Sequence, residues 1–210
     1  MNVLAVQGPD GWTLVDTGTG GSPKRIQAGL DSLGVAPGQL ARIYLTHHHP
    51  DHVGGLKAMR AWAPGAEIVA SEHEAEIISG RRPIDRSANP VFGRLQGMMR
   101  IPVVAVDRTV KAGDAVGPLT VVATPGHTLG HTSLFDPGNR LLFTADAIGA
   151  LPRKLRVGVR RFLCADPALA RRSVAELLEL DFDTVAFAHG PVIREGAKER
   201  LRTILAACSY

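Results

Sequence analysis

The residues best suited to chemistry lie in one short stretch, residues 46–52, which holds four histidines and one aspartate. Imidazole nitrogens and carboxylate oxygens suit zinc, and iron and manganese accept the same donors. The spacing His47-x-His49 lets both rings leave a loop on one side. Asp51 and His52 follow closely enough to face a second ion. The alternative is a solvated histidine run that binds metal only adventitiously.

The residues on either side predict how the chain presents this stretch. The apolar-rich residues 41–45 predict a buried strand before it, and residues 56–62 predict a helix after two glycines. The histidines are therefore expected on a strand-to-helix loop, where turns of the backbone aim several side chains at one point.

The rest of the chain alternates between short apolar runs bounded by turn signals and longer helical patterns. Strands are predicted at residues 3–6, 12–15, 67–70, 103–106, 119–123, 132–135, 141–143 and 184–188, and helices at 24–33, 71–79, 166–180 and 193–207. Ser71 and Glu74 have the spacing of a capping box, and His73 between them is expected to face solvent. Residues 80–100 lose this periodicity, which predicts a lid or binding loop or, equally, apolar packing beneath a loop.

Three later stretches and one early turn also contain histidine or aspartate. They are TPGHTLGH around His127, LFTADA around Asp146 and AFAHGP around His189, and an early VDTG turn contains Asp16. Together with residues 46–52, these motifs resemble the metallo-β-lactamase superfamily, in which a His-x-His-x-Asp-His motif follows a strand. The resemblance covers nearly the whole chain and points to the glyoxalase II and lactonase-like branch.

This resemblance implies an α+β fold, a four-layer αββα sandwich, as a single domain over residues 1–210. It also implies two divalent metal ions, zinc by default with iron or manganese as alternatives, and no organic cofactor. The implied ligands are His47, His49 and His127 for the first ion, Asp51, His52 and His189 for the second, and Asp146 as the bridge. Asp16 would brace the metal loop through hydrogen bonds, unless it is a plain turn residue. His48 is expected to point away, and His131 to support the ligands from behind.

Two ions that share a hydroxide can cleave a small ester, lactone or thioester, and Asp51 is the candidate catalytic residue that orients or deprotonates the water. The resemblance therefore predicts a dinuclear-metal hydrolase. The alternatives are a phosphodiesterase or nuclease of the same superfamily, and a mononuclear iron dioxygenase. A glutathione thioester is disfavoured because residues 190–210 are too few for a glutathione-binding helical domain. The tyrosine that lactonases often carry after the bridging aspartate is also absent.

Composition limits the class of protein, its cellular location and the partners to be expected. The 210 residues include 45% hydrophobic ones, an ordinary share for a globular protein, and no apolar run is long enough to cross a bilayer. Two cysteines are too few for a disulfide framework, and the N-terminus lacks an export signal, so a cytoplasmic location is expected. The net charge of +4 permits anionic partners. A small-molecule substrate is expected, with no membrane partner, and nucleic acid is disfavoured because the chain lacks room for an RNA-clamping arm.

Residues 151–161 carry five cations and no acid, shortly after Asp146. Arg153, Lys154 or Arg156 would attract an anionic substrate if this stretch faces the entrance of the site. A solvated basic face is the alternative.

Overall fold

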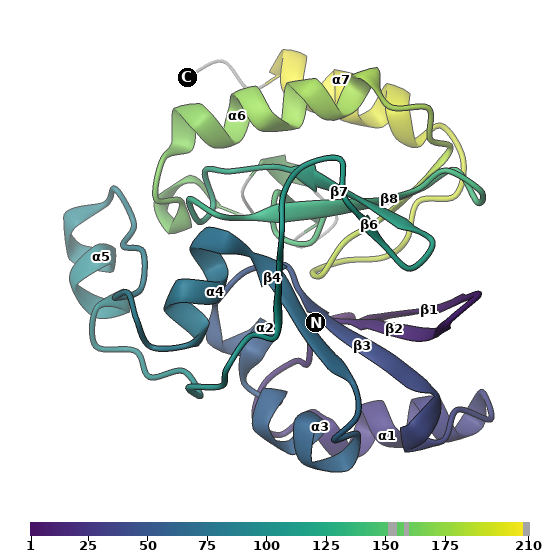
Figure 1. Ribbon diagram of the computed structural model, residues 1–210. Coiled ribbons are helices and arrows are strands. Elements are labelled where there is room, and N and C mark those ends of the chain that lie inside the picture. The colour runs from purple at the N-terminus through teal and green to yellow at the C-terminus, as the bar shows by residue number, and fades with distance from the viewer. Residues whose placement is uncertain (151–154, 158–159, 208–210) are drawn as a thin grey trace. The chain divides into compact units, whose positions relative to one another are not determined.

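The computed structural model describes residues 1–150, 155–157 and 160–207 (Figure 1). The chain divides into two compact units. The first unit contains Val3–Ile84 and Met99–Pro118, and the second contains Asn2, Asp85–Met98 and the chain from Leu119 onward. Each unit has its own sheet and its own hydrophobic core. No helix in the described part of the chain is long and apolar enough to cross a membrane.

The first unit is built on a five-stranded sheet with the strand order β1-β2-β3-β4-β5. Its strands are β1 (Leu4–Gly8), β2 (Gly11–Val15), β3 (Leu40–Leu45), β4 (Glu67–Ser71) and β5 (Arg108–Val110). β1 and β2 form an antiparallel hairpin, and the strands from β2 to β5 run parallel. Parallel neighbours end at the same edge of a sheet, so the loops that follow β2, β3 and β4 start side by side.

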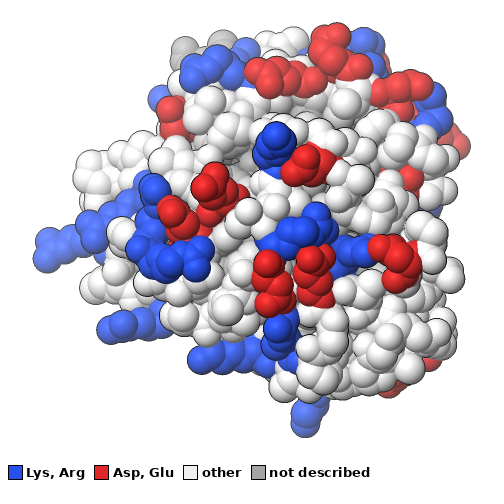
Figure 2. All heavy atoms as spheres, in the orientation of Figure 1, with Lys and Arg blue, Asp and Glu red and all other residues white. Residues whose placement is uncertain are grey.

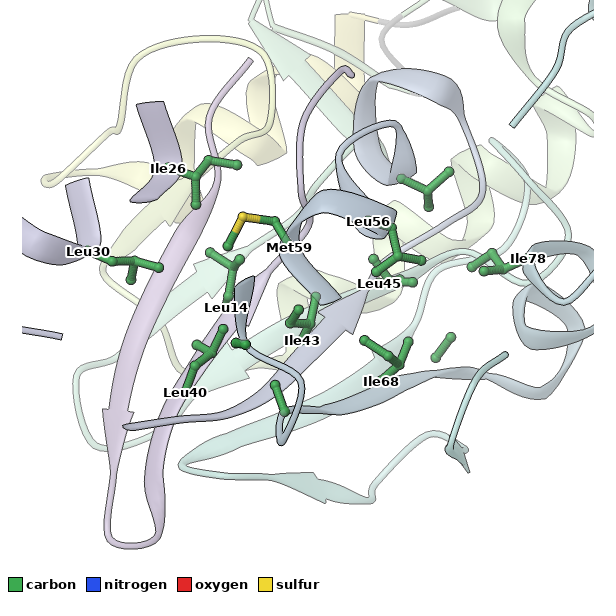
Figure 3. Close-up of a cluster of buried hydrophobic side chains, with 14 of the residues drawn as sticks. Leu14, Ile26, Leu30, Leu40, Ile43, Leu45, Leu56, Met59, Ile68 and Ile78 are labelled. Atoms are coloured by element: carbon green, nitrogen blue, oxygen red, sulfur yellow. The ribbon is translucent and has the colours of Figure 1, made fainter. Parts of the chain in front are cut away.

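The helices of this unit are α1 (Pro23–Ser32), η1 (Pro37–Gln39), α2 (Pro50–Val53), α3 (Leu56–Trp62) and α4 (Glu72–Ile78), and a short strand, β6 (Ala115–Val116), lies near the end of the unit. The α-helices of this unit bury apolar residues in its core, whereas the short 3-10 helix η1 has no buried residue. Leu14 and Ile43 of the sheet gather with Met59 of α3 in the core (Figure 3). Each fully buried side chain of this size contributes roughly 1.5–3 kcal/mol, so the strand ends stand on a rigid base.

The second unit has a sheet in which β12, β9, β8 and β7 are neighbours in that order. These strands are β7 (Leu119–Ala123), β8 (Thr132–Asp136), β9 (Leu141–Phe143) and β12 (Thr184–Ala186), and a separate hairpin joins β10 (Ile148–Ala150) to β11 (Leu155–Val157). β9 and β12 are parallel, whereas β7, β8 and β9 alternate in direction.

The helices of the second unit are α5 (Pro90–Gln96), η2 (Arg161–Leu163), α6 (Pro167–Glu176), η3 (Leu177–Glu179) and α7 (Ala197–Ala207). α6 and α7 lie side by side (Figure 1), and Arg171 of α6 donates a hydrogen bond to the Leu205 carbonyl of α7. Val174 and Leu201 from these helices share one core with Leu142 of the sheet. This core supports the strands from which Asp146 and His189 emerge.

Two sequence-based expectations are wrong. Residues 103–106 do not form a strand; Val104 and Val106 pack against the first core without joining the sheet, and the strand lies at β5 instead. Apolar alternation reports burial on one side, and it does not supply a hydrogen-bonding neighbour. Residues 80–100 are not irregular throughout, because α5 begins there. Asn89 caps α5 by accepting a hydrogen bond from the Phe92 N–H at 3.0 Å, with Pro90 at the first position.

Candidate metal site

The candidate ligands His47, His49, Asp51 and His52 lie in residues 46–52, here called the metal loop. This loop follows the end of β3, as the sequence predicts. Pro50 begins α2 directly after His49, and the first turn of this helix presents Asp51 and His52. His47 Nε2 lies 3.1 Å from His49 Nδ1, and His52 Nε2 lies 3.8 Å from Asp51 Oδ2. The structure therefore groups these four side chains in two adjacent pairs.

The spacing of these pairs fits metal ligation. Two atoms bound tetrahedrally to one ion at roughly 2.0–2.1 Å lie about 3.3 Å apart, and the two observed distances bracket this value. His47 and His52 are buried, whereas the Asp51 side chain is 38% exposed. The donors are therefore largely shielded from bulk water, and one carboxylate remains accessible to a substrate.

Asp16 braces this loop from the end of β2, which confirms its expected role. Its carboxylate accepts hydrogen bonds from the Thr46 N–H at 2.9 Å and from His52 Nδ1 at 2.8 Å. Because a carboxylate can only accept, Nδ1 of His52 carries the proton and Nε2 keeps the lone pair that a metal needs. Asp16 is fully buried and has a φ of 64°, an uncommon conformation for a residue other than glycine.

The Thr46 hydroxyl links the Asp16 carboxylate to the ring of His47 and so sets the tautomer of His47 as well. The Thr46 hydroxyl donates to Asp16 at 2.9 Å and lies 3.1 Å from His47 Nδ1. A hydroxyl has a single proton, so it accepts from Nδ1–H and leaves Nε2 of His47 as the ligating nitrogen. One buried carboxylate thus sets the tautomers of two candidate ligands.

His48 has Glu74 as its hydrogen-bond partner, and its ring also lies edge-on to the His49 ring with the centroids 5.2 Å apart. His48 Nδ1 lies 2.6 Å from Glu74 Oε2, and the same oxygen accepts the His48 backbone N–H at 2.8 Å. Ser71 caps α4 by accepting a hydrogen bond from the Glu74 N–H, as the predicted capping box requires, and the Glu74 carboxylate accepts from His48. His73, expected to face solvent, is half-buried and so only partly open to solvent.

The second unit brings together the other three candidate ligands. Asp146 follows β9, and His189 follows β12, the parallel neighbour of β9, so both emerge at the same end of the sheet. Asp146 Oδ2 lies 3.4 Å from His127 Nε2, and Asp146 Oδ1 lies 3.6 Å from His189 Nε2. Each carboxylate oxygen thus faces a different imidazole.

His131 supports Asp146 from behind, which confirms its predicted role. Its Nε2 accepts the Asp146 backbone N–H at 3.2 Å, and its Nδ1 lies 2.8 Å from Thr124 Oγ1.

Gly126, next to His127, lets this loop approach the backbone of α6 closely, since a Cβ at position 126 would lie 2.1 Å from the Ala170 nitrogen. The His127 loop is therefore closely packed on the start of α6.

Asn2 and Asp85 are supporting residues that the sequence analysis missed. Asn2 Nδ2 donates to the carbonyls of Phe187 at 3.0 Å and Gly190 at 2.7 Å, on either side of His189. Asp85 accepts the Leu129 N–H at 2.7 Å, two residues after His127. No local motif signals these roles, because the bonded residues are 44 to 188 positions apart in the chain.

Cys164 does not qualify as a nucleophile. Burial raises the pKa of its thiol to about 12, so it is neutral at pH 7.

The basic stretch, residues 151–161, is described only in part: Arg153 and Lys154 lie outside the described residues, and Arg156 is exposed on β11. Figure 2 shows cationic and anionic side chains interspersed on the face that it draws.

The chain belongs to the metallo-β-lactamase superfamily. It matches the family model described as "Metallo-beta-lactamase superfamily" over residues 2–189. Solved structures agree: a Cronobacter sakazakii metallo-β-lactamase mutant aligns with a TM-score of 0.74 at 24% identity, covering 98% of this chain and 87% of its own. TTHA1623, solved in a di-iron-bound form, aligns with a TM-score of 0.72 at 27% identity, covering 95% of this chain and 92% of its own. The expected α+β metallo-β-lactamase fold is confirmed.

Curated relatives of similar sequence include two hydroxyacylglutathione hydrolases. The Rhizobium meliloti protein is 32% identical over 162 residues, which cover 75% of this chain and 51% of that protein. The Brucella anthropi protein is 31% identical over 149 residues, covering 69% and 45%. The uncharacterised Bacillus subtilis protein YobT is 31% identical over 149 residues, covering 70% and 61%. The chain thus spans about half the length of the two hydrolases.

Proposed function

We propose that this chain is a metal-dependent hydrolase with one dinuclear centre in a single domain over residues 1–210. The proposed ligands are His47, His49, Asp51, His52, His127, Asp146 and His189. The observation that carries the proposal is Asp146, whose two oxygens each face a different histidine within 3.6 Å. Asp16 supports it further by holding His52 in the tautomer that can bind a metal.

Divalent ions bound by these ligands would acidify a water molecule and polarise a substrate oxygen. We assign to Asp51 the role of orienting the attacking water and accepting its proton, because its carboxylate is partly exposed beside His52. Zinc is the proposed metal, since the donors are imidazoles and carboxylates. Iron is the alternative, which the di-iron-bound form of TTHA1623 favours.

The proposed substrate is a small carboxylic ester, lactone or thioester. Two hydroxyacylglutathione hydrolases at 31% and 32% identity support this class. The neutral thiol of Cys164 supports attack by water in place of a cysteine nucleophile. We further propose a small-molecule partner, which the basic stretch around Arg156 suggests is anionic, and a cytoplasmic setting, which the low cysteine count supports.

Metal analysis combined with a substrate screen tests this proposal. The protein is purified without added metal, analysed for its elements, reconstituted with Zn²⁺, Fe²⁺ or Mn²⁺, and assayed on lactones, thioesters, aryl esters and phosphodiesters. We expect two ions per chain and hydrolysis of a carboxylic ester, lactone or thioester. Asp146→Asn should lose both, whereas Asp136→Asn, a change at another buried aspartate of the same unit, should keep both.

Each contrary result has a definite meaning. Cleavage confined to phosphodiesters would transfer the chain to the nuclease branch. One ion per chain, together with oxygen consumption, would favour the mononuclear iron dioxygenase. A reconstituted protein that binds no metal would refute the proposal.

A further inference from the structure

The metal loop of the first unit leaves the central strand of three parallel neighbours. β3 pairs with β2 on one side and with β4 on the other, and all three strands end at the same edge. Asp16 follows β2, the loop follows β3, and Glu74 lies in α4 directly after β4. The loop is thus placed between two carboxylates that belong to the neighbouring strands.

These carboxylates hold different parts of the loop. Asp16 binds Thr46 at its start and His52 at its end. Glu74 binds its middle, where one oxygen accepts both the backbone N–H and the ring Nδ1 of His48. His48 stands between the candidate ligands His47 and His49, so its backbone direction determines theirs.

The burial of Glu74 indicates that this contact matters. Its side chain and that of His48 are 0% and 1% exposed, and a carboxylate removed from water is costly unless it is paired. Glu74 occupies the third position of α4, where the Ser71 cap accepts its backbone N–H. Its carboxylate bonds to His48, which is 26 residues away in the chain.

We propose that Glu74 is a positioning residue of the metal loop, and that it acts through His48 to keep His47 and His49 turned toward the first metal ion. The inference rests on the proposed function, because it concerns ligands of the same centre. The two hydrogen bonds to Glu74 fix the backbone and ring of His48, and the neighbouring residues His47 and His49 continue from that fixed backbone. Asp16 holds His52 independently, so loss of Glu74 should weaken the first ion more than the second.

Competition titration tests this. The dissociation constants of both Co²⁺ equivalents are measured against a chelator for the full-length apo-protein, and the visible absorption spectrum is recorded at each step. His49→Ala, which removes a ligand of the first ion, identifies the constant that belongs to that ion. The test variants are Glu74→Ala and Glu74→Gln; the near-isosteric amide keeps an acceptor for the His48 N–H. The matched control is Glu76→Ala in the same helix, which removes a partly exposed ion pair between Glu76 and Arg82.

We expect Glu74→Ala to weaken the first equivalent about 10–100-fold and to change its Co²⁺ spectrum, with the second equivalent within about threefold of wild type. Glu74→Gln should show a smaller loss in the same direction, and it decides the outcome if the alanine variant does not fold. Wild-type constants and spectra in the glutamine variant, or equal losses at both ions, would reduce Glu74 to a purely structural role. A wild-type protein that binds no Co²⁺ would instead refute the proposed function itself, and this inference with it.

Discussion

Replacing Asp16 by asparagine keeps the size of the side chain but turns one of its two oxygens into an N–H donor. The wild-type carboxylate accepts the Thr46 N–H on one oxygen, and the Thr46 hydroxyl and His52 Nδ1 on the other, within a fully buried site. The asparagine oxygen can replace only one of these acceptors. If it stays with the Thr46 N–H, the new N–H₂ group faces His52 Nδ1.

The imidazole can then keep a hydrogen bond only by accepting at Nδ1, which places its proton on Nε2. A protonated Nε2 cannot bind a metal, so metal binding requires the original tautomer, with the proton on Nδ1. In that tautomer the Nδ1–H of His52 and the N–H₂ group of the asparagine are two donors that face each other. Leaving a buried donor unsatisfied costs about 1–3 kcal/mol. Since about 1.4 kcal/mol corresponds to tenfold in affinity, the second ion should bind roughly 5–150-fold more weakly. Asparagine tolerates the positive φ of 64° at this position, so the fold itself should persist.

Two measurements check this reasoning. Long-range ¹H–¹⁵N NMR of the apo-protein reports the His52 tautomer, which should switch from Nδ1–H to Nε2–H in Asp16→Asn. Chelator competition then reports the affinity of each ion. Asp31→Asn, the same chemical change at an exposed position of α1, is the control and should alter neither quantity. An unchanged His52 tautomer together with wild-type affinity for both ions would refute the argument.

Three further changes probe the supports of the site and of the first unit. Gly126→Ala should lower the free energy of unfolding by at least ~2 kcal/mol in urea titration, because the new Cβ meets the α6 backbone at a φ of 131°; wild-type stability would contradict this. Asn2→Ala removes the bonds that bracket His189 and should weaken one of the two ions in chelator competition while leaving the other unchanged. The Arg60 guanidinium, through its hydrogen bond, lowers the pKa of Asp107 below its usual 3.8. The stability from this pair is present above pH 3.8 and is lost as the pH falls through the lower folded-state pKa. Asp107→Asn should therefore be less stable than wild type at pH 7 and nearly equal at strongly acidic pH, and a constant deficit at both would count against the ion pair.

The sequence by itself determined the candidate ligands and the loop that carries those of the first unit. The buried strand before residue 46 and the helix α3 after Gly54 and Gly55 form as predicted, whereas the short helix α2 starts at Pro50, inside the stretch predicted as a loop. The strand-helix junction was therefore predictable. Residues 103–106 do not form the expected strand. A strand needs a hydrogen-bonded neighbouring strand in the sheet, and a local sequence pattern does not specify that neighbour.

The tertiary structure decided what supports the ligands. Glu74 has the sequence context of a helix cap, yet its carboxylate bonds to His48 because the parallel pairing of β3 and β4 brings the two strand ends together. Asn2 contacts the His189 loop across 185 to 188 positions of the chain. Such contacts depend on which strands become neighbours, and that choice is made by burial of the whole core. The candidate ligands can thus be recognised from local sequence, whereas the orientation of each of them is set by the fold.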